Sequence, residues 1–211
     1  MVSTEAVAAA MGAGKYAQAL EEACIRFKIE SAVEKSHFLA HMFVESQGFT
    51  RIRENLGYSA ERLLEVFPGR NGLKTLAQAK AIVARGRAAI AEAIYGGAWG
   101  AENLGNIHPG DGALFAGRSL IHLTGRTNVA AYSMATYGDD RVVRNPVMLE
   151  ELPDAALAAG WYWVWRGCGE PARRDDLVGS TLKVNGGRNG LAERAQALAK
   201  AKQLFARLVA R

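Results

Sequence analysis

Apolar residues recur every three or four positions along most of the chain, a spacing that places them on one face of an α-helix. Residues 4–27 follow this pattern, so we expect one amphipathic helix there, or two helices separated at the Gly12 and Gly14 pair. A helix is also predicted over about 32–47, and Gly48 is expected to end it. Further helices are predicted after Ser59, over 74–94 with a weak point at Gly86, from about Asn128, from Asp154, after Asp175 or Asp176, and along Leu191 to Leu208.

The stretch 95–117 differs from these segments because it is rich in glycine, which favours left-handed and tight turns. We expect it to be a long loop, anchored by Tyr95, Trp99 and Phe115, and followed by a short extended piece over 119–124. No segment alternates as a set of strands would, so the predicted architecture is mainly α. A second aromatic cluster is assigned mostly to the core, with a sugar-binding platform as the alternative: Trp161, Tyr162, Trp163 and Trp165.

Length and composition narrow the class of protein. The 211 residues are enough for one well-buried domain, and 49% hydrophobic and 22% charged residues are typical of a soluble globular protein. No run approaches the roughly 18 apolar residues of a transmembrane helix, and the N-terminus lacks the basic start of a secretory signal. We therefore expect synthesis in the cytoplasm without a signal peptide and no stable membrane insertion. Cys24 and Cys168 are expected to be free and buried.

Positive charge gathers near the C-terminal end of the chain. The net charge is +5, and from Lys183 onward seven basic residues stand against Glu193 alone. A basic face favours an anionic partner such as nucleic acid, a membrane surface or an acidic cell-wall polymer, whereas any single one of these residues more often lies on a solvated helix face. Few aromatic residues interleave with the basic ones, so we expect no nucleic-acid partner. The basic residues are Lys183, Arg188, Arg194, Lys200, Lys202, Arg207 and Arg211.

Candidate chemistry concentrates in the stretch 36–59. His37, His41 and Glu45 follow one another at intervals of four residues and therefore lie on one helix face, and Glu54 follows after a short polar stretch. The two carboxylates form a candidate acid–base pair, although ionisable residues on helix faces usually just meet water. The two histidines also suggest a zinc site. However, one helix face rarely places a third ligand eight residues on in tetrahedral geometry, and no HExxH motif is present.

Three segments, in order, resemble a known family: HFLAHMFVESQGF with ENLGYSAERLLEVFP, then YGG with GNIHPGDGALFAGRSLIHLTGR, then VNGGRNGLAER. Together they span about residues 36 to 200 and resemble the catalytic domain of glycoside hydrolase family 19, in the bacterial and phage branch that includes endolysins. The resemblance implies a mainly α, lysozyme-like, two-lobed fold with a cleft between the lobes. It also implies hydrolysis of β-1,4 links between N-acetylated sugars, without a cofactor or metal.

The resemblance also assigns roles to individual residues. Glu45 matches the general acid, Glu54 matches the second catalytic carboxylate, and Thr124 falls where a hydroxyl helps hold the attacking water. The family inverts configuration, which implies carboxyls about 6.5–9.5 Å apart. Glu45 would be kept protonated by partial burial against Phe38 and Val44. The expected substrate-binding residues, of which the arginines are equally candidates for structural roles, are His122, Asn128, Asn185, Arg118, Arg126, Arg194, Tyr58 and Ser59.

The chain departs from the family pattern near the expected site. His122 stands where most members have Gln, and Ser119 replaces the usual glycine after the motif arginine. Val129 occupies a position where an aromatic residue is expected, and the turn ESGG reads ESQG. No departure removes a catalytic carboxylate, so activity is still expected, while the geometry of the sugar subsites is left open.

The sequence thus predicts one catalytic domain over residues 1–211, with a smaller lobe within about 55–110. The predicted function is an inverting, endolysin- or muramidase-like glycosidase that cleaves peptidoglycan. We expect it to act as a monomer, and to reach the periplasmic wall with the help of a hole-forming protein, a holin. The alternatives are a chitinase, a non-catalytic wall-binding module and a zinc enzyme.

Overall fold

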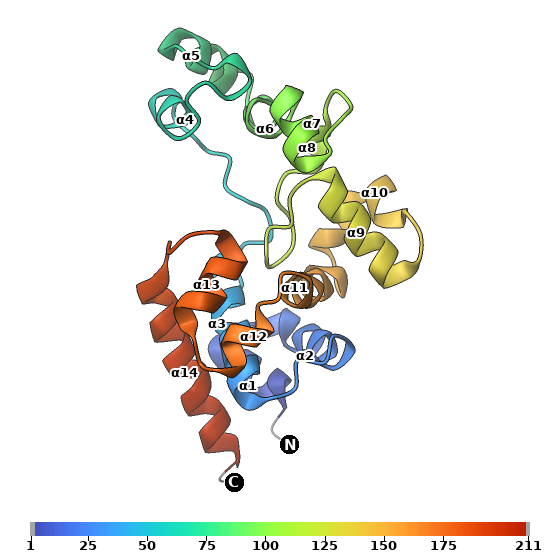
Figure 1. Cartoon of the computed structure of the whole chain (residues 1–211), viewed down its shortest axis with the longest axis vertical. Helices are drawn as coiled ribbons and strands as arrows, with labels where there is room; N and C mark the ends of the chain where they lie inside the picture. The colour runs from blue at the N-terminus through green and yellow to red at the C-terminus, as the bar shows by residue number, and fades with distance from the viewer. Residues whose placement is uncertain (1–2, 210–211) are drawn as a thin grey trace. The chain divides into compact units, whose positions relative to one another are not determined.

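The computed structural model describes residues 3–209, and every regular element among them is a helix (Figure 1). Isolated β-bridges join Arg53 with Arg118 and Arg118 with Leu123. The predicted mainly α architecture is therefore confirmed. The chain divides into two compact units. Unit 1 contains the residues up to Ile52, Ser119–Ile121 and the residues from Met148 onward, and unit 2 contains Arg53–Arg118 and His122–Val147.

Unit 1 is built around α3 (Ala32–Glu45), which packs chiefly against the last helix, α14, and also contacts α12, α13 and α1. Phe38, Leu39 and Met42 are fully buried on α3, and each buried side chain of this kind contributes about 1.5–3 kcal/mol. The remaining elements of this unit are α1 (Thr4–Met11), the 3-10 helix η1 (Gly14–Tyr16), α2 (Ala17–Arg26), α11 (Asp154–Trp165), α12 (Gly169–Arg173), α13 (Leu177–Asn185) and α14 (Leu191–Val209). The 3-10 helix η3 (Pro146–Glu150) spans the sequence boundary between the units.

The ends of α3 determine where Glu45 lies. Ser31 caps the first turn by accepting a hydrogen bond from Glu34 N, as expected of a serine at this position. The helix ends at Glu45, earlier than predicted, because Gln47, Gly48 and Phe49 all adopt left-handed backbone. Glu45 is therefore the last residue of the helix rather than part of its interior.

Two predictions about helix breaks in unit 1 have clear outcomes. Of the two alternatives for residues 4–27, the structure shows two helices, because Gly12 ends α1 with φ 105°. Asp176, and not Asp175, caps α13 by accepting a hydrogen bond from Gly179 N. Cys24 and Cys168 are free and buried, as predicted.

The aromatic cluster of α11 is only partly core. Trp163 is fully buried and Trp161 is 7% exposed, which agrees with the predicted core role. Trp165 is 49% exposed and stacks on Trp161 with ring centroids 5.0 Å apart.

Within residues 3–209, no helix combines the length and the apolar character that a membrane crossing would require.

Unit 2 has a smaller core made by its first helices. Ser59 caps the first of them, as predicted, and Thr75 forms a capping box with Gln78 at the next. Gly86 separates two helices in the predicted Ala-rich stretch. The elements are α4 (Ala60–Val66), the 3-10 helix η2 (Arg70–Gly72), α5 (Leu76–Ala84), α6 (Arg87–Tyr95), α7 (Gly97–Leu104), α8 (Asp111–Leu114), α9 (Arg126–Tyr137) and α10 (Arg141–Arg144). The core cluster consists of Ala60, Leu63, Leu73, Ala79, Ile90 and Ile94.

The prediction of a long loop over 95–117 is wrong, because α7 and α8 lie within it. At Gly112, a Cβ atom would lie 2.6 Å from Gly96 N and 2.9 Å from Glu92 Cα. The glycine therefore permits α8 to approach α6 closely. A high glycine content by itself does not show whether the glycines form turns or allow such close packing. The expected extended piece at 119–124 is reduced to the isolated bridge that ends at Leu123.

Candidate active site

Glu45 is held by a buried arginine. Its side chain is 19% exposed, and Arg194 Nη2 donates a hydrogen bond of 2.5 Å to Glu45 Oε1. A carboxylate at a helix C-terminus meets the negative end of the helix dipole, which is unfavourable. The guanidinium of Arg194, only 3% exposed, offsets that repulsion. The expected protonated state of Glu45 stays a prediction.

The segment VNGGRNG approaches Glu45 from α13 and α14. Asn185 Nδ2 and Arg194 Nε both donate to Asn189 O, at 3.3 and 3.4 Å. A Cβ on Gly190 would lie 3.4 Å from Val44 Cγ1, next to Glu45 in the chain. Two predicted site residues, Asn185 and Arg194, are thus brought together with Glu45 within unit 1.

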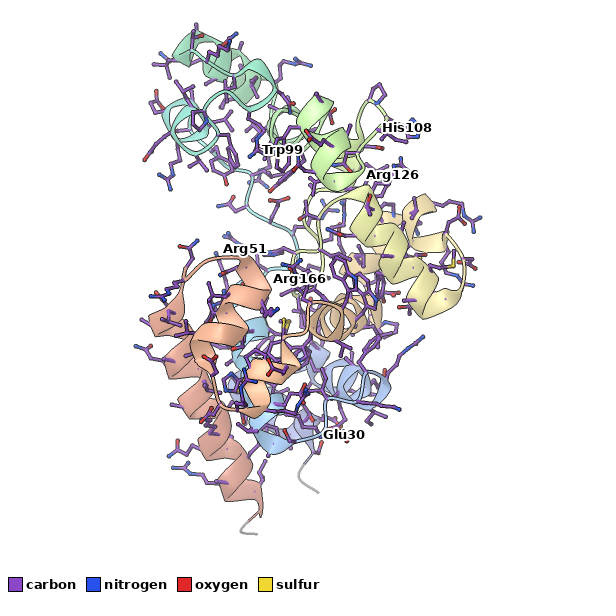
Figure 2. The ribbon with its side chains drawn as sticks, in the orientation of Figure 1. Glu30, Arg51, Trp99, His108, Arg126 and Arg166 are labelled. Carbon is purple, nitrogen blue, oxygen red and sulfur yellow. The ribbon has the colours of Figure 1, made fainter. Side chains whose placement is uncertain are left out.

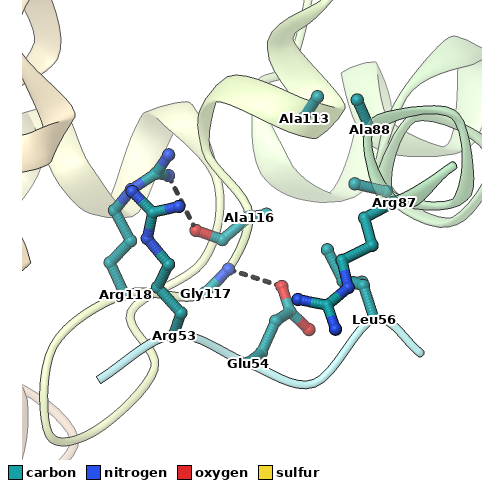
Figure 3. Close-up of a pocket in the computed structure, with 10 residues that line it drawn as sticks. Arg53, Glu54, Leu56, Arg87, Ala88, Ala113, Ala116, Gly117 and Arg118 are labelled. Carbon is teal, nitrogen blue, oxygen red and sulfur yellow. Dashed lines mark hydrogen bonds between the residues drawn. The ribbon is translucent and has the colours of Figure 1, made fainter. Parts of the chain in front are cut away.

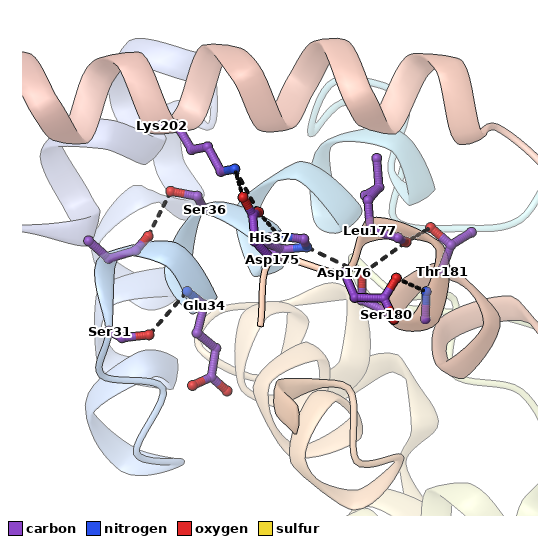
Figure 4. Close-up of polar contacts among 12 residues, drawn as sticks. Ser31, Glu34, Ser36, His37, Asp175, Asp176, Leu177, Ser180, Thr181 and Lys202 are labelled. Carbon is purple, nitrogen blue, oxygen red and sulfur yellow. Dashed lines mark hydrogen bonds and ion pairs between the residues drawn. The ribbon is translucent and has the colours of Figure 1, made fainter. Parts of the chain in front are cut away.

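The two histidines of α3, His37 and His41, are fully buried. Figure 4 shows His37 among polar side chains that include Asp175 and Ser180. His41 Nδ1 lies 2.7 Å from Arg194 Nη1, and His41 Nε2 lies 3.1 Å from Ser180 Oγ. His37 lies 3.3 Å from the same hydroxyl and 2.8 Å from Asp175 Oδ1. Burial lowers the pKa of His37, and burial together with Arg194 lowers the pKa of His41 further. Among residues 3–209, no group of three or more His, Cys, Asp or Glu side chains is placed to hold a metal ion.

Glu54 is held by uncharged donors in unit 2 (Figure 3). Gly117 N donates to Glu54 Oε1 at 2.5 Å, and the phenol of Tyr95 donates to Glu54 Oε2 at 2.6 Å. The backbone N–H of Glu54 also donates to Gly117 O at 3.0 Å. Burial, and then the negative charge of Glu54, raise the pKa of Tyr95, so the phenol keeps the proton that it donates.

A pocket of about 220 Å³ opens beside Glu54 (Figure 3). Arg118 lines it and donates from Nη1 to the carbonyl oxygens of Leu114 and Ala116. The pocket is lined by the polar and charged residues Arg53, Glu54, Arg87 and Arg118, by Gly117, and by the apolar residues Leu56, Ala88, Ala91, Ala113 and Ala116.

Three further predicted residues gather around Gly117. A Cβ there would lie 3.0 Å from His122 Cβ and 3.1 Å from Thr124 Oγ1, so only glycine allows this close approach without displacement. Thr124 Oγ1 donates to His122 O at 2.8 Å, and Asn128 Nδ2 donates to Thr124 O at 2.7 Å. His122 has a φ of 52°, which is uncommon outside glycine. The structure therefore connects His122, Thr124 and Asn128 with the backbone that holds Glu54.

Arg126, Tyr58 and Ser59 have visible structural functions. Arg126, labelled in Figure 2, lies on α9. It forms a two-pronged ion pair with buried Asp111, with bonds of 2.6 and 2.8 Å, and lowers the pKa of that carboxyl. Tyr58 packs edge-on against Phe67, and Ser59 caps α4. Their expected contacts with substrate stay predictions.

The sequence reasoning missed three kinds of partner. Tyr95 was assigned only to anchoring a loop, yet its hydroxyl bonds Glu54 across 41 positions of sequence. Arg87 lines the pocket from α6 without belonging to any recognised motif. Ser180 lies 139 positions from His41, and no local sequence pattern predicts a contact over that separation.

The basic C-terminal tail is not simply a solvated face. Arg194 is buried against Glu45, and Lys202 Nζ pairs with Asp175 at 2.5 Å. Arg211 lies outside the described residues. Part of the charge that suggested an anionic partner therefore serves internal contacts of unit 1.

Comparisons with known proteins identify the family and the fold of the chain. No family model matches the chain. A Haemophilus influenzae protein described as a glycosyl hydrolase family 19 domain-containing protein is 32% identical over 170 residues, which are 78% of this chain and 76% of that protein. A crystal structure of a chitinase C mutant covers 90% of this chain and 83% of its own, with a TM-score of 0.54; at 16% identity it shows the shared fold alone. The chain belongs to glycosyl hydrolase family 19.

Proposed function

We propose that this family 19 glycoside hydrolase cleaves the β-1,4 links between the N-acetylated amino sugars of peptidoglycan, with inversion of configuration. In this proposal Glu45 is the general acid and Glu54 is the general base. The observation that carries it is the setting of Glu54: both of its oxygens accept hydrogen bonds, beside an open pocket lined by arginines. A carboxylate held this way is oriented without being neutralised by a direct ion pair.

The proposal assigns one proton transfer to each carboxylate. Glu45 Oε1 accepts from Arg194, so Oε2 is the oxygen that would carry the proton for the leaving sugar oxygen. Glu54 would take a proton from water as the water attacks the sugar carbon. Thr124 donates its hydroxyl proton to His122 O, which leaves oxygen lone pairs to accept a hydrogen bond from that water. Asn128 and Asn185 are proposed to contact the sugar hydroxyl and acetamido groups.

The net charge of +5 and the position of Arg87 beside Glu54 suit peptidoglycan better than chitin. Chitin is an uncharged polymer, whereas the peptide stems of peptidoglycan carry carboxylates. Arg87 lines one small pocket together with Glu54, and guanidinium groups bind carboxylates with paired, charge-assisted hydrogen bonds. Such a surface would also raise the rate at which an anionic polymer associates.

Digestion of two polymers tests the proposal. The purified protein should clear Gram-negative peptidoglycan in a zymogram and release few reducing ends from colloidal chitin. Glu45→Gln, which keeps the size of the side chain and cannot supply an acidic proton, should clear neither. Absence of clearing by the wild-type protein, or full clearing by Glu45→Gln, would contradict the proposal.

Chitin hydrolysis is the second candidate, because the solved structure with a similar fold is that of a chitinase. Faster release of reducing ends from chitin than from peptidoglycan would favour it. Mass spectrometry of the digested muropeptides would identify the bond that is cut. If peptidoglycan is the substrate, the protein acts at the cell wall, and release through a holin is the route that we propose.

A further inference from the structure

We propose that His41, Ser180, His37 and Asp175 form a buried positioning relay that holds Arg194, and through it Glu45, in one orientation. This inference rests on the proposed role of Glu45 as the general acid. It concerns residues that do not touch the reacting atoms and that act through Arg194. All of them belong to unit 1.

The relay is continuous from Glu45 to the protein surface. Arg194 bonds Glu45 through Nη2 and His41 through Nη1, at 2.5 and 2.7 Å. Ser180 Oγ then lies between the two histidines, 3.1 Å from His41 and 3.3 Å from His37. His37 reaches Asp175 at 2.8 Å, and Lys202 from α14 pairs with the same carboxylate (Figure 4).

Arg194 and Asp175, at the two ends of the histidine network, determine the direction of the hydrogen bonds between them. A guanidinium only donates, so His41 Nδ1 must accept, and the proton of neutral His41 must lie on Nε2, facing Ser180. At the other end Lys202 and His37 both face Asp175, and hydrogen bonds from these two groups lower its pKa, so that this carboxylate accepts. His37 Nε2 must then carry the proton of that ring.

Ser180 completes a single consistent arrangement. Its oxygen accepts from His41 Nε2, and its own proton points to His37 Nδ1, the acceptor nitrogen of that ring. The other acceptor within reach is Leu177 O, at 3.1 Å. Choosing it would leave the lone pairs of Ser180 and His37 facing each other. Each of the two histidines is therefore neutral and fixed as the Nε2–H tautomer.

The surroundings keep both histidines neutral. The charged groups that face His37 are Asp175, Asp176 and Lys202, and those that face His41 are Arg194 and, when it is protonated, His37. Trp163 from α11 covers His41, with ring centroids 5.5 Å apart. A proton on His41 Nδ1 would place two donors against each other at Arg194, which agrees with the lowered pKa of this histidine.

The position of Arg194 depends on its acceptors, because a buried guanidinium without hydrogen-bond acceptors is unfavourable in free energy. Such a guanidinium moves toward other acceptors. Arg194 is 3% exposed and has Asn189 O, His41 and Glu45 as acceptors. If His41 turned its protonated nitrogen toward Arg194, the guanidinium would lose an acceptor and move away from its present position. Glu45, at the very end of α3, would then change orientation as well.

Nuclear magnetic resonance of the ring nitrogens tests the geometry without any need for activity. In the wild-type protein, His37 and His41 should both appear as neutral Nε2–H tautomers at pH 7. Ser180→Ala should shift the Arg194 Nε–H signal, and Thr181→Val should not. Thr181 is the matched control, because it is buried on the same helix and its hydroxyl donates its hydrogen bond to Leu177 O rather than to a histidine. An Nδ1–H tautomer at His41 would overturn the relay.

Kinetics on the polymer that the wild-type protein hydrolyses test the positioning role. Ser180→Ala should lower kcat about tenfold with little change in KM, since one hydrogen bond between buried partners is lost. Thr181→Val should leave kcat within about twofold of wild type. Equal losses in both variants, or no loss in Ser180→Ala, would overturn the proposal.

A variant at the surface tests the relay independently, in case Ser180→Ala does not fold. Asp175→Asn removes charge at a half-exposed position at the outer end of the relay and should shift the His37 ring signals and lower kcat about threefold. Unchanged His37 signals would contradict the relay. If the wild-type protein hydrolyses neither polymer, the proposed function fails while the resonance experiment still decides whether the relay exists.

Discussion

Glu45 and Glu54 are the same residue type, proposed for opposite halves of one reaction, and they are held in opposite ways. Glu45 ends a helix in unit 1 and bonds a cation, Arg194, which lies 149 positions away. Glu54 lies on irregular backbone in unit 2 and bonds two uncharged donors, Gly117 N and the Tyr95 hydroxyl. The first contact comes from helix packing in the core, and the second from a short bridge between two loops.

This difference shows how surroundings can assign separate roles to equal carboxylates. Glu45 is tied to a network that extends through two buried histidines, so its orientation depends on the interior of unit 1. Glu54 depends on the close approach of Gly117 and on one phenol. Substitutions in the core should therefore affect the acid, and substitutions near the pocket should affect the base.

The largest expected effect comes from removing either carboxylate. Glu45→Gln and Glu54→Gln should each lower kcat by about a hundredfold or more, because proton transfer in the transition state is lost. Reducing-end assays on the preferred polymer give the rates, and circular dichroism checks that the fold is kept. Activity of Glu54→Gln within about threefold of wild type would remove Glu54 from the catalytic pair.

Tyr95→Phe should have the next largest effect. Loss of the phenol leaves Glu54 Oε2 without that donor and should lower kcat about tenfold. Thr181→Val serves as the control, since it also removes a hydroxyl that donates to a backbone oxygen, that of Leu177 in unit 1. A lower kcat in Tyr95→Phe alone would support the view that Glu54 depends on its uncharged donors. Equal changes of kcat in the two variants would contradict it.

Gly117→Ala should produce a smaller loss, because the added methyl group would push on His122 and Thr124 at 3.0–3.1 Å. We expect kcat to fall by about threefold to tenfold with the fold intact. Gly138→Ala is the contrasting variant, with no atom within 4 Å but a φ of 76°, so it should cost about 1–2 kcal/mol of stability and leave kcat unchanged. Loss of kcat in Gly138→Ala would show that the assay reports stability rather than the geometry at Glu54.

The smallest expected effect is on stability at mildly acidic pH. The folded state lowers the pKa of His37 and His41 below 6.5, so the unfolded chain binds more protons once the pH falls below that value. The free energy of unfolding should therefore decrease as the pH drops from about 7 to 5, by at most about 1.4 kcal/mol per pH unit for each histidine. Urea denaturation at several pH values measures the slope.

His41→Gln is the control for this pH dependence. Glutamine offers an oxygen to Arg194 and does not titrate, so the slope should be shallower than in the wild-type protein. An equal slope in the two proteins would mean that His41 does not set the pH dependence. The carboxyl of Asp175 has a lowered pKa and titrates at more acidic pH, outside this range.

The amino-acid sequence by itself determined many of the helices and located the segments that carry the proposed site. Apolar spacing located α3, α11 and α14, and side-chain caps located the starts of α4 and α13, because these signals act within a few residues. The ordered motifs around Glu45, Thr124 and Asn185 pointed to the family that the comparison with a relative then showed.

Only the tertiary structure decided what each of these residues touches. The glycine-rich stretch 95–117 folds into helices because its glycines permit close packing, and spacing along the chain does not reveal a neighbour in space. The histidines that first suggested a zinc site meet Ser180 and Asp175, far away in sequence. Local patterns follow from local forces, whereas burial and hydrogen-bond partners follow from the packing of distant segments, and the carboxylate settings depend on the latter.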